Sequence, residues 1–382
     1  MNGQNPFLTI GYEGPETFCD RVRETAELLA AIRNGRNVTL IAPRRYGKTG
    51  LIHHVMRSVS DEYDKVYLDI YATENLSDFV KEFARAVVSS LETTSEKVLS
   101  ALGRFFGSLR PTMTPQPDGS IKWSFDLAPS MVKTSLEETF AYLKRHGRPV
   151  VIAIDEFQQV RKYPEYSVEA LLRSYIQFLP NVRFIFAGSQ LHLMSDMFVS
   201  PRGPFYNSTD ILSLDVIRKD AYREFAARFF GEAGRAFCGD AFDALYDRFD
   251  GITWYVQSVL NRTWDCPDGL KSVDDISRAV HSLIENRRLV FLDLLRSQSS
   301  TQQSVLRAVA ADGVVSAPTG KDFLGRHALG AASTVASVIE ALVEKELLYR
   351  TETGYVVYDR LFGEWLGDRN VMSQKTPHTR RM

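Results

Sequence analysis

The segment Asn37–Leu51, NVTLIAPRRYGKTGL, constrains the fold of this chain more than any other. An apolar run, expected to form a buried strand, passes through a turn containing Gly47 into a helix that begins with Lys48-Thr49. A turn of backbone N–H groups followed by a helix N-terminus suits phosphate groups, because both direct partial positive charge at the anion. The segment therefore predicts a site for a nucleotide triphosphate.

Two side chains of this segment are assigned chemical roles. Lys48 supplies a mobile positive charge to the β- and γ-phosphates, and the hydroxyl of Thr49 binds Mg²⁺. The match to G-x-x-x-x-G-K-[ST] is incomplete, because Ala42 stands at the first glycine position. Alanine suffices there if the backbone keeps a negative φ, whereas Gly47 beside the phosphates has no substitute. The residues expected around the phosphates are Pro43, Arg44, Arg45, Tyr46, Gly47, Lys48, Thr49 and Gly50. The alternative is an ordinary surface turn that carries a lysine, which the flanking strand and helix disfavour.

A second segment, PVVIAIDE at residues 149–156, supplies the groups that hydrolysis needs. Five apolar residues predict a fully buried strand, and the two carboxylates follow at its C-terminal edge, where open α/β sheets bind ligands. We expect Asp155 to hold Mg²⁺ through water and Glu156 to orient and deprotonate the attacking water. The alternative is a strand that ends in two solvated acids.

The predicted strand Val182–Gly188 ends next to Ser189. In a neighbouring position of the sheet, the Ser189 hydroxyl is a candidate for contacting the γ-phosphate or positioning water. A Gly-Ser pair also ends ordinary turns, and this alternative stays open.

The composition excludes several classes of function. The net charge is −1, with 46 basic and 47 acidic residues, so no overall field draws the chain to nucleic acid or membrane. The three cysteines show no C-x-x-C spacing, which indicates a reducing compartment and neither a disulfide framework nor a metal site. We see no signal peptide and no apolar run of membrane-spanning length. A cytoplasmic protein without a membrane partner is therefore expected.

Strand-like and helix-like segments alternate through residues 1–214, which predicts an α/β fold with a parallel sheet flanked by helices. An inserted β-hairpin at residues 109–127, with a turn at Pro117-Asp118-Gly119, interrupts this order. The predicted strands are Asn37–Ala42, Lys65–Tyr71, Pro149–Asp155, Val182–Gly188 and Ile211–Leu214. The predicted helices are Lys48–Ser60, Leu76–Phe106, Lys133–His146 and Glu165–Phe178.

Beyond residue 214 the strands stop and helical periodicity dominates. Residues 215–298 predict a helical subdomain, and residues 299–369 predict a winged helix that closes with a hairpin around Glu352-Thr353-Gly354. The tail at residues 370–382 is polar and basic and is expected to be disordered. Predicted helices of this half are Asp220–Glu232, Gly239–Arg248, Thr253–Asn261, Val273–Leu295, Gln302–Asp312, Lys321–His327 and Ser333–Leu347.

Several segments together resemble a known family. The loop APRRYGKTG, the strand VVIAIDEFQQV and the strand end FIFAGSQ resemble those of archaeal-type P-loop ATPases of the AAA+/STAND group. FCDRVRETAEL is similar to the F-x-G-R-x-x-E-L segment near their N-terminus, and YVVYDRLFGEWL to the end of their winged helix. The resemblance covers most of the chain. It implies a P-loop core, a helical lid and a C-terminal winged helix, with ATP and Mg²⁺ as ligands.

The resemblance also implies that Asp20, Arg21, Gly251 and Thr253 lie near the adenine and ribose. Two positions depart from the family pattern. Thr253 replaces the proline of the lid motif Gly-x-Pro. In the loop before its last core strand the family often carries an arginine after Pro-Leu-Tyr-Gly, whereas here Pro204-Phe205-Tyr206 is followed by Asn207-Ser208. The nearest basic residue in that loop is Arg202, either a solvated charge or an arginine that acts on the γ-phosphate.

The third helix of the winged-helix region, STVASVIEALVEKEL, carries three glutamates and one lysine. Recognition helices usually present basic or amide side chains to DNA, so this acidic face favours packing against the core or contact with a protein partner. We therefore expect a nucleotide-driven molecular switch that hydrolyses ATP slowly and self-associates in some nucleotide states. The alternatives are an ATP-regulated DNA-binding protein and a nucleotide-binding scaffold without hydrolysis.

Overall fold

The computed structural model describes residues 4–92, 98, 100, 101, 104, 106–116 and 121–368. The chain divides into two compact units, Met1–Arg228 with Asp250–Gln257, and Phe229–Phe249 with Ser258–Met382. The hairpin turn predicted at residues 117–119 and the tail at residues 370–382 lie outside the described residues. Each unit is described by itself.

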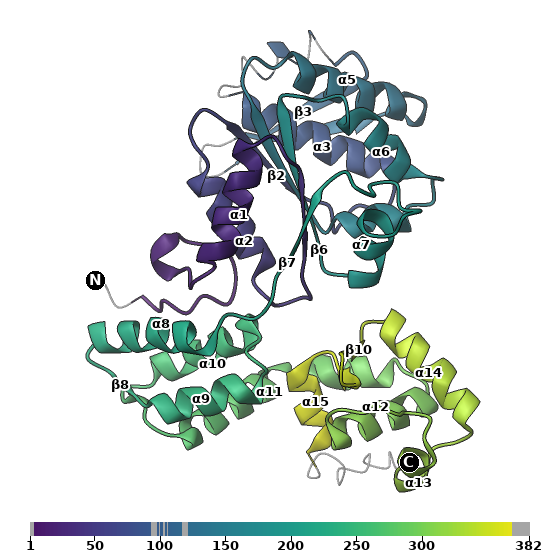
Figure 1. Cartoon of the computed structure of the whole chain (residues 1–382). Coiled ribbons are helices and arrows are strands. Elements are labelled where there is room, and N and C mark those ends of the chain that lie inside the picture. The colour runs from purple at the N-terminus through teal and green to yellow at the C-terminus, as the bar shows by residue number, and fades with distance from the viewer. Residues whose placement is uncertain are drawn as a thin grey trace, which may run out of the picture. The chain divides into compact units, whose positions relative to one another are not determined.

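A parallel sheet of five strands forms the centre of the first unit (Figure 1). The strands stand in the order β2 (Asp64–Asp69), β5 (Val150–Asp155), β6 (Val182–Gly188), β1 (Val38–Ile41) and β7 (Asp210–Ser213). Because all pairs are parallel, the carboxyl ends of the strands meet at one edge. The predicted α/β fold is confirmed, with every predicted core strand in place to within two residues at either end.

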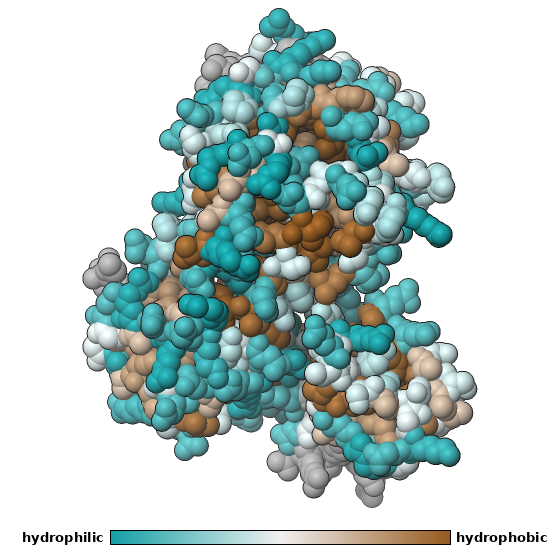
Figure 2. All heavy atoms as spheres, viewed as in Figure 1, coloured by the Kyte–Doolittle hydropathy of each residue, from teal (hydrophilic) through white to brown (hydrophobic). Residues whose placement is uncertain are grey.

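Helices cover both faces of this sheet. Successive side chains of β5 point to opposite faces, and all of them are buried. Val151 and Ala153 face a cluster that contains α1 (Val22–Arg33) and α2 (Lys48–Ser58). The alternate residues Val150, Ile152 and Ile154 face the larger cluster on the other side. That cluster is built by α3 (Leu76–Leu91), α5 (Val132–Arg145), α6 (Val168–Ile176) and α7 (Leu191–Phe198). The surface seen in Figure 2 is accordingly mostly hydrophilic, with hydrophobic residues in separate patches.

One predicted helix was too long. The expectation of a single helix over Leu76–Phe106 is wrong, because α3 ends at Leu91 and Glu92 has extended backbone with φ −108° and ψ 121°. The hydroxyl of Tyr142 on α5 donates a hydrogen bond of 2.6 Å to the Glu92 carboxylate. The inserted hairpin is present as antiparallel β3 (Leu109–Pro115) and β4 (Ile121–Leu127). Among its described residues the unit also has three short 3₁₀ helices: η1 (Pro15–Thr17), η2 (Pro129–Met131) and η3 (Phe157–Lys162).

The helices α8 (Lys219–Glu232) and α10 (Thr253–Asp265) each begin in the first unit and end in the second. The second unit also holds α9 (Gly239–Arg248) and α11 (Val273–Arg296). The expectation that strands stop after residue 214 is wrong in one detail. The two-residue strands β8 (Ala236–Phe237) and β9 (Gly269–Leu270) pair in parallel, and such short elements leave no periodic signal in a sequence.

The C-terminal part of the second unit has the predicted three helices and hairpin. They are α12 (Ser300–Asp312), α13 (Lys321–Arg326), α14 (Ala332–Glu344), β10 (Leu348–Arg350) and β11 (Tyr355–Val357). A further helix, α15 (Arg360–Gly367), follows the hairpin and was not predicted. Its Phe362 ring packs 5.4 Å from Phe291 of α11, and its Glu364 pairs with Arg248 at 2.7 Å. Among the described residues, no helix has both the length and the apolar character needed to cross a bilayer.

Candidate active site at the phosphate loop

The loop between β1 and α2 has the backbone conformation of an anion-binding turn. Arg45 and Gly47 adopt left-handed conformations, with φ values of 75° and 87°. Gly47 is the N-cap residue of α2, where a positive φ favours glycine over any residue with a Cβ. The N-terminus of α2 and the preceding loop residues line one cavity. The geometry suits phosphate oxygens.

Three donors hold the carbonyl groups of this loop. The Trp254 N–H donates to the Arg45 carbonyl oxygen at 3.0 Å. The Tyr46 carbonyl oxygen accepts a hydrogen bond of 3.0 Å from the Arg21 guanidinium and one of 3.3 Å from the Thr253 hydroxyl. In a trans peptide the N–H points opposite to the C=O, so fixing these carbonyls also fixes the direction of the next N–H groups. The loop is therefore pre-organised by residues far from it in the sequence.

The side chain of Arg45 is engaged with the first turn of α10. Its guanidinium donates to the Tyr255 hydroxyl and lies 4.8 Å from the centre of the Trp254 ring and 5.0 Å from that of Tyr255. Cation–π contacts of this length are attractive, by about 0.5–2 kcal/mol each. Arg45 lines the cavity beside the loop, and these contacts show a role for its side chain that the sequence does not indicate.

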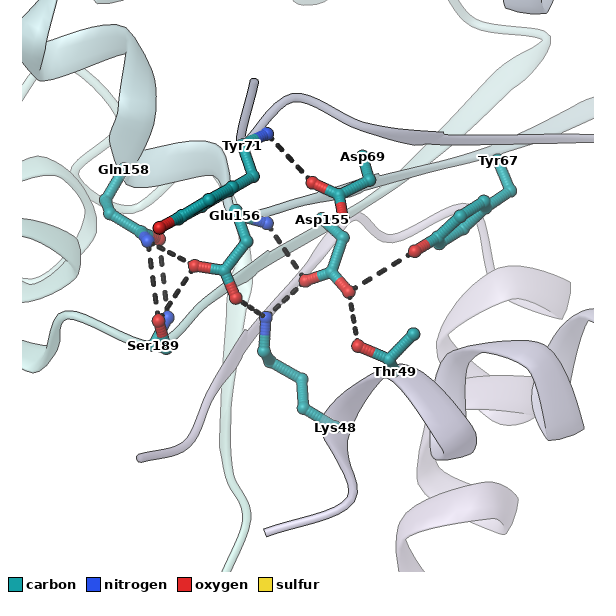
Figure 3. A network of polar contacts seen from close by, with 9 residues as sticks. All are labelled: Lys48, Thr49, Tyr67, Asp69, Tyr71, Asp155, Glu156, Gln158 and Ser189. Atoms are coloured by element: carbon teal, nitrogen blue, oxygen red, sulfur yellow. Dashed lines mark hydrogen bonds and ion pairs between the residues drawn. The ribbon is translucent and has the colours of Figure 1, made fainter. Parts of the chain in front are cut away.

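The Lys48 ammonium pairs with the two carboxylates at the end of β5 (Figure 3). It donates to Asp155 and, at 2.9 Å, to Glu156, and its side chain is 6% exposed. Asp155 is 1% exposed and also accepts a 2.7 Å hydrogen bond from the Thr49 hydroxyl. The predicted site residues from the two motifs, 107 positions apart, are thus brought into one hydrogen-bonded group.

The residues around these carboxylates respond to burial and to negative charge. Burial raises the pKa of the Tyr67 hydroxyl, and the nearby Asp155 carboxylate raises it further. Burial also raises the pKa of Asp69, whose partner in the β2–β5 register is Asp155. Both groups therefore ionise less readily than they do in water.

Glu156 is fixed in an unusual backbone conformation. Its φ of 55° and ψ of 38° are left-handed, which costs a residue other than glycine about 1–2 kcal/mol. One carboxylate oxygen, Oε1, accepts from Lys48, while Oε2 accepts from Ser189 at 2.8 Å and from Gln158 at 2.5 Å. The carboxylate is thereby held at the cavity that the phosphate loop borders.

The loop, Lys48 and Glu156 line a cavity of about 540 Å³, within the usual size of a small-molecule site. All eight predicted loop residues, Pro43 to Gly50, line it, as do Arg21, Glu156, Ser189 and Thr253. Asp20 and Gly251, expected near the base and ribose, do not line it; Asp20 is exposed and Gly251 is buried. Asp155 does not line the cavity but accepts a hydrogen bond from Thr49, which does.

Several lining residues were not predicted. They are Leu8, Thr9, Ile10, Gly11, Tyr12, Thr17, Phe18, Cys19, Asp69, Tyr71, Ile217, Trp254 and Gln257. The place of Asp69 could have been predicted from the sequence. It ends a strand that neighbours β5, and parallel strands end at the same edge of a sheet. Residues 8–12 follow no motif, and only the folded chain brings them to the loop.

The oxygen donors of Thr49 and Asp155 fit a magnesium ion. Mg²⁺ prefers one or two protein oxygens completed by water and substrate phosphates, and these two donors lie 2.7 Å apart. Across the described residues, no group of three or more His, Cys, Asp or Glu side chains forms a complete metal site. An ion here would depend on the nucleotide for its remaining ligands.

Comparisons with known proteins agree with this geometry. The sequence model of a family described as an ATPase domain predominantly from Archaea matches residues 18–259. A second, described as a probable winged helix domain, matches residues 289–368. No curated protein matches the sequence.

Solved structures with the same fold include a Walker-type ATPase of Pyrococcus abyssi, with a TM-score of 0.65 and 19% identity over 94% of this chain and 99% of that one. The ORC2 protein of Aeropyrum pernix, in complexes with ADPNP and ADP, has a TM-score of 0.57 and 14% identity over 95% and 96% of the chains. The Aeropyrum pernix ORC1 protein in complex with DNA has a TM-score of 0.52 and 16% identity, covering 92% and 93%. At these identities the likeness concerns the fold alone.

Proposed function

We infer the function of this chain from the family to which it belongs, the ATPase domain predominantly from Archaea. We propose that it binds ATP with Mg²⁺ in the phosphate-loop cavity, hydrolyses the ATP slowly and acts as a nucleotide-driven switch. In this proposal Lys48 binds the β- and γ-phosphates, Thr49 and Asp155 hold the ion, and Glu156 activates water. Ser189 positions that water or contacts the γ-phosphate.

The observation that carries the proposal is the pairing of Lys48 with Asp155 and Glu156 beside a left-handed Gly47 at the start of α2. An ammonium, a hydroxyl and two carboxylates at one helix N-terminus form the set that phosphoryl transfer uses. Phosphates compete with the carboxylates for Lys48, so nucleotide binding frees Glu156 to accept a proton. Release of phosphate from ATP by the purified chain, dependent on Mg²⁺ and lost in Lys48→Met, tests the proposal; release that survives the substitution contradicts it.

Contacts at the start of α10 support the switch. Arg45 and Tyr46 of the loop are held by Thr253, Trp254 and Tyr255, and α10 then continues to Asp265 in the second unit. A change in the loop on phosphate binding therefore changes the contacts that hold the first turn of α10, a helix that both units share. Movement of an element that has two arrangements is the usual basis of a nucleotide switch.

This switch predicts that ATP and ADP give different distances between the two units. Cys266 is exposed in the second unit and Tyr166 is 97% exposed in the first, so dyes at Cys266 and at Tyr166→Cys report the distance by energy transfer. Cys238 is replaced by Ser to prevent labelling there. We expect Arg45→Ala to reduce the ATP-dependent change while ATP still binds, and Arg33→Ala on the far end of α1 to leave it intact. Equal transfer with ATP, with ADP and without nucleotide would refute the switch.

We propose that the winged helix serves core packing or a protein contact rather than DNA. Val335, Ile339 and Leu342 of α14 are buried, while Glu340 and Glu344 are exposed. An acidic exposed face repels phosphates and releases no counterions from DNA. We expect no salt-sensitive binding in a titration of duplex DNA at low ionic strength. Binding that weakens steeply with salt and falls further in Arg350→Ala, on the exposed wing, would favour the DNA-binding alternative.

A further inference from the structure

We propose that Gln158 is a positioning residue that holds Glu156 for catalysis, an inference that rests on the ATPase function proposed above. Gln158 follows β5 in η3 and is 2% exposed. Its amide nitrogen donates to Glu156 Oε2 at 2.5 Å and to the Ser189 hydroxyl at 3.5 Å. Its amide oxygen accepts from the Ser189 N–H at 3.3 Å (Figure 3).

These bonds form a closed group of three residues. The Ser189 hydroxyl also donates to Glu156 Oε2 at 2.8 Å, so that oxygen receives two hydrogen bonds. A primary amide is the one side-chain group that donates to a carboxylate with its nitrogen while accepting from a backbone N–H with its oxygen. Neither glutamate nor leucine at position 158 makes both bonds. The group therefore explains why an amide side chain suits this position.

The absence of a side chain at Gly188, the last residue of the neighbouring strand, leaves room for this amide. A Cβ at Gly188 would lie 2.4 Å from Gln158 Oε1 and 2.4 Å from the Met194 sulfur. Both distances are shorter than van der Waals contact, so Gly188 permits the amide to pack against the end of β6. The amide packs there while 2% of the Gln158 residue is exposed.

The two carboxylate oxygens of Glu156 have different partners and therefore different roles. Gln158 and Ser189 hold Oε2, whereas Oε1 is bound by Lys48, which the nucleotide phosphates compete for. Once Lys48 turns to the phosphates, Oε1 is the oxygen left to accept a proton. The water oxygen then bonds to the γ-phosphorus, and the bond to the β,γ-bridging oxygen breaks with its electron pair left on ADP. The water proton passes to Oε1.

A positioning role predicts that Gln158→Leu lowers kcat about 10- to 100-fold, as loss of catalytic geometry does, with the Kd for ATP changed less than about threefold. Gln159→Leu is the matched control, because Gln159 is the next residue of η3 and donates to the Thr73 carbonyl, away from Glu156. It should keep the kcat of the unmodified chain. Gln158→Glu keeps the size of the side chain but loses its donor, and serves if the leucine variant does not fold; it should lower kcat at least as much.

A double variant separates positioning from general damage. Under single-turnover conditions, adding Gln158→Leu to Glu156→Gln should change the residual rate little, because the residue acts through Glu156. Losses that multiply in the double variant, or equal losses of kcat and ATP affinity, overturn the inference. If Glu156→Gln itself keeps full turnover, Glu156 is not the base of the proposed function, and the role of Gln158 is refuted with it. If Glu156→Gln is inactive but Gln158→Leu and Gln158→Glu hydrolyse ATP normally, only the role of Gln158 is refuted.

Discussion

Glu156→Gln is expected to lower the turnover of ATP by about 10²–10⁴-fold, the usual contribution of a general base, while ATP still binds. The substitution keeps the size of the side chain, and its amide oxygen can still accept from Ser189 and Gln158. Its amide nitrogen, however, carries no lone pair that accepts a proton from water. The same nitrogen faces Lys48 as a donor rather than as an acceptor, so the ion pair with Lys48 is lost.

Loss of that ion pair leads to a second, independent prediction, which concerns the affinity for ATP. ATP no longer has to draw Lys48 away from Glu156, so its affinity for Glu156→Gln should equal or exceed that for the unmodified chain. Calorimetric titration with ATP and Mg²⁺ measures the affinity, and release of labelled phosphate measures the turnover. Glu62→Gln, an exposed glutamate before β2, is the control and should change neither. Unchanged turnover in Glu156→Gln would exclude Glu156 as the base.

The parts of this site that could be predicted from the sequence are local. A strand, a glycine turn and a helix start are adjacent in the chain, so NVTLIAPRRYGKTGL specifies the positions of Lys48 and Thr49 by itself. The end of β5 is equally local, because five apolar residues followed by two acids define both the strand and its exit. That the loop after β1 and the end of β5 lie together follows from the parallel sheet alone, since parallel strands end at one edge.

The parts that could not be predicted depend on contacts between distant segments. Arg45 meets Tyr255, 210 residues later, and no local pattern distinguishes an arginine that binds an aromatic ring from one that binds a phosphate. Asp20 is a similar case. The family resemblance implies that Asp20 and Arg21 both lie near the nucleotide, but Asp20, with a φ of 54°, is exposed, while Arg21, the next residue, lines the cavity. A shift of one residue in a left-handed turn reverses which side chain faces inward.

Lys48→Met is expected to affect ATP binding and folding stability for two different reasons. Loss of the ammonium removes a charge-assisted contact with the phosphates, which should weaken ATP binding by about 2–5 kcal/mol. Loss of the same group leaves the Asp155 carboxylate buried at 1% exposure without its cation. Breaking a buried ion pair from one side costs about 3–5 kcal/mol, and we expect the lower value because Thr49 and the Glu156 N–H still donate to Asp155.

The double variant Lys48→Met with Asp155→Asn separates the two effects. It leaves no unpaired charge on Asp155, so its free energy of unfolding in urea should recover most of what Lys48→Met loses. Its affinity for ATP should remain as weak as that of the single variant, since neither change restores a cation at the phosphates. If the double variant is no more stable than Lys48→Met, the pair with Asp155 is not the source of the loss. Lys48 would then stabilise the fold through Glu156, the other carboxylate that it contacts.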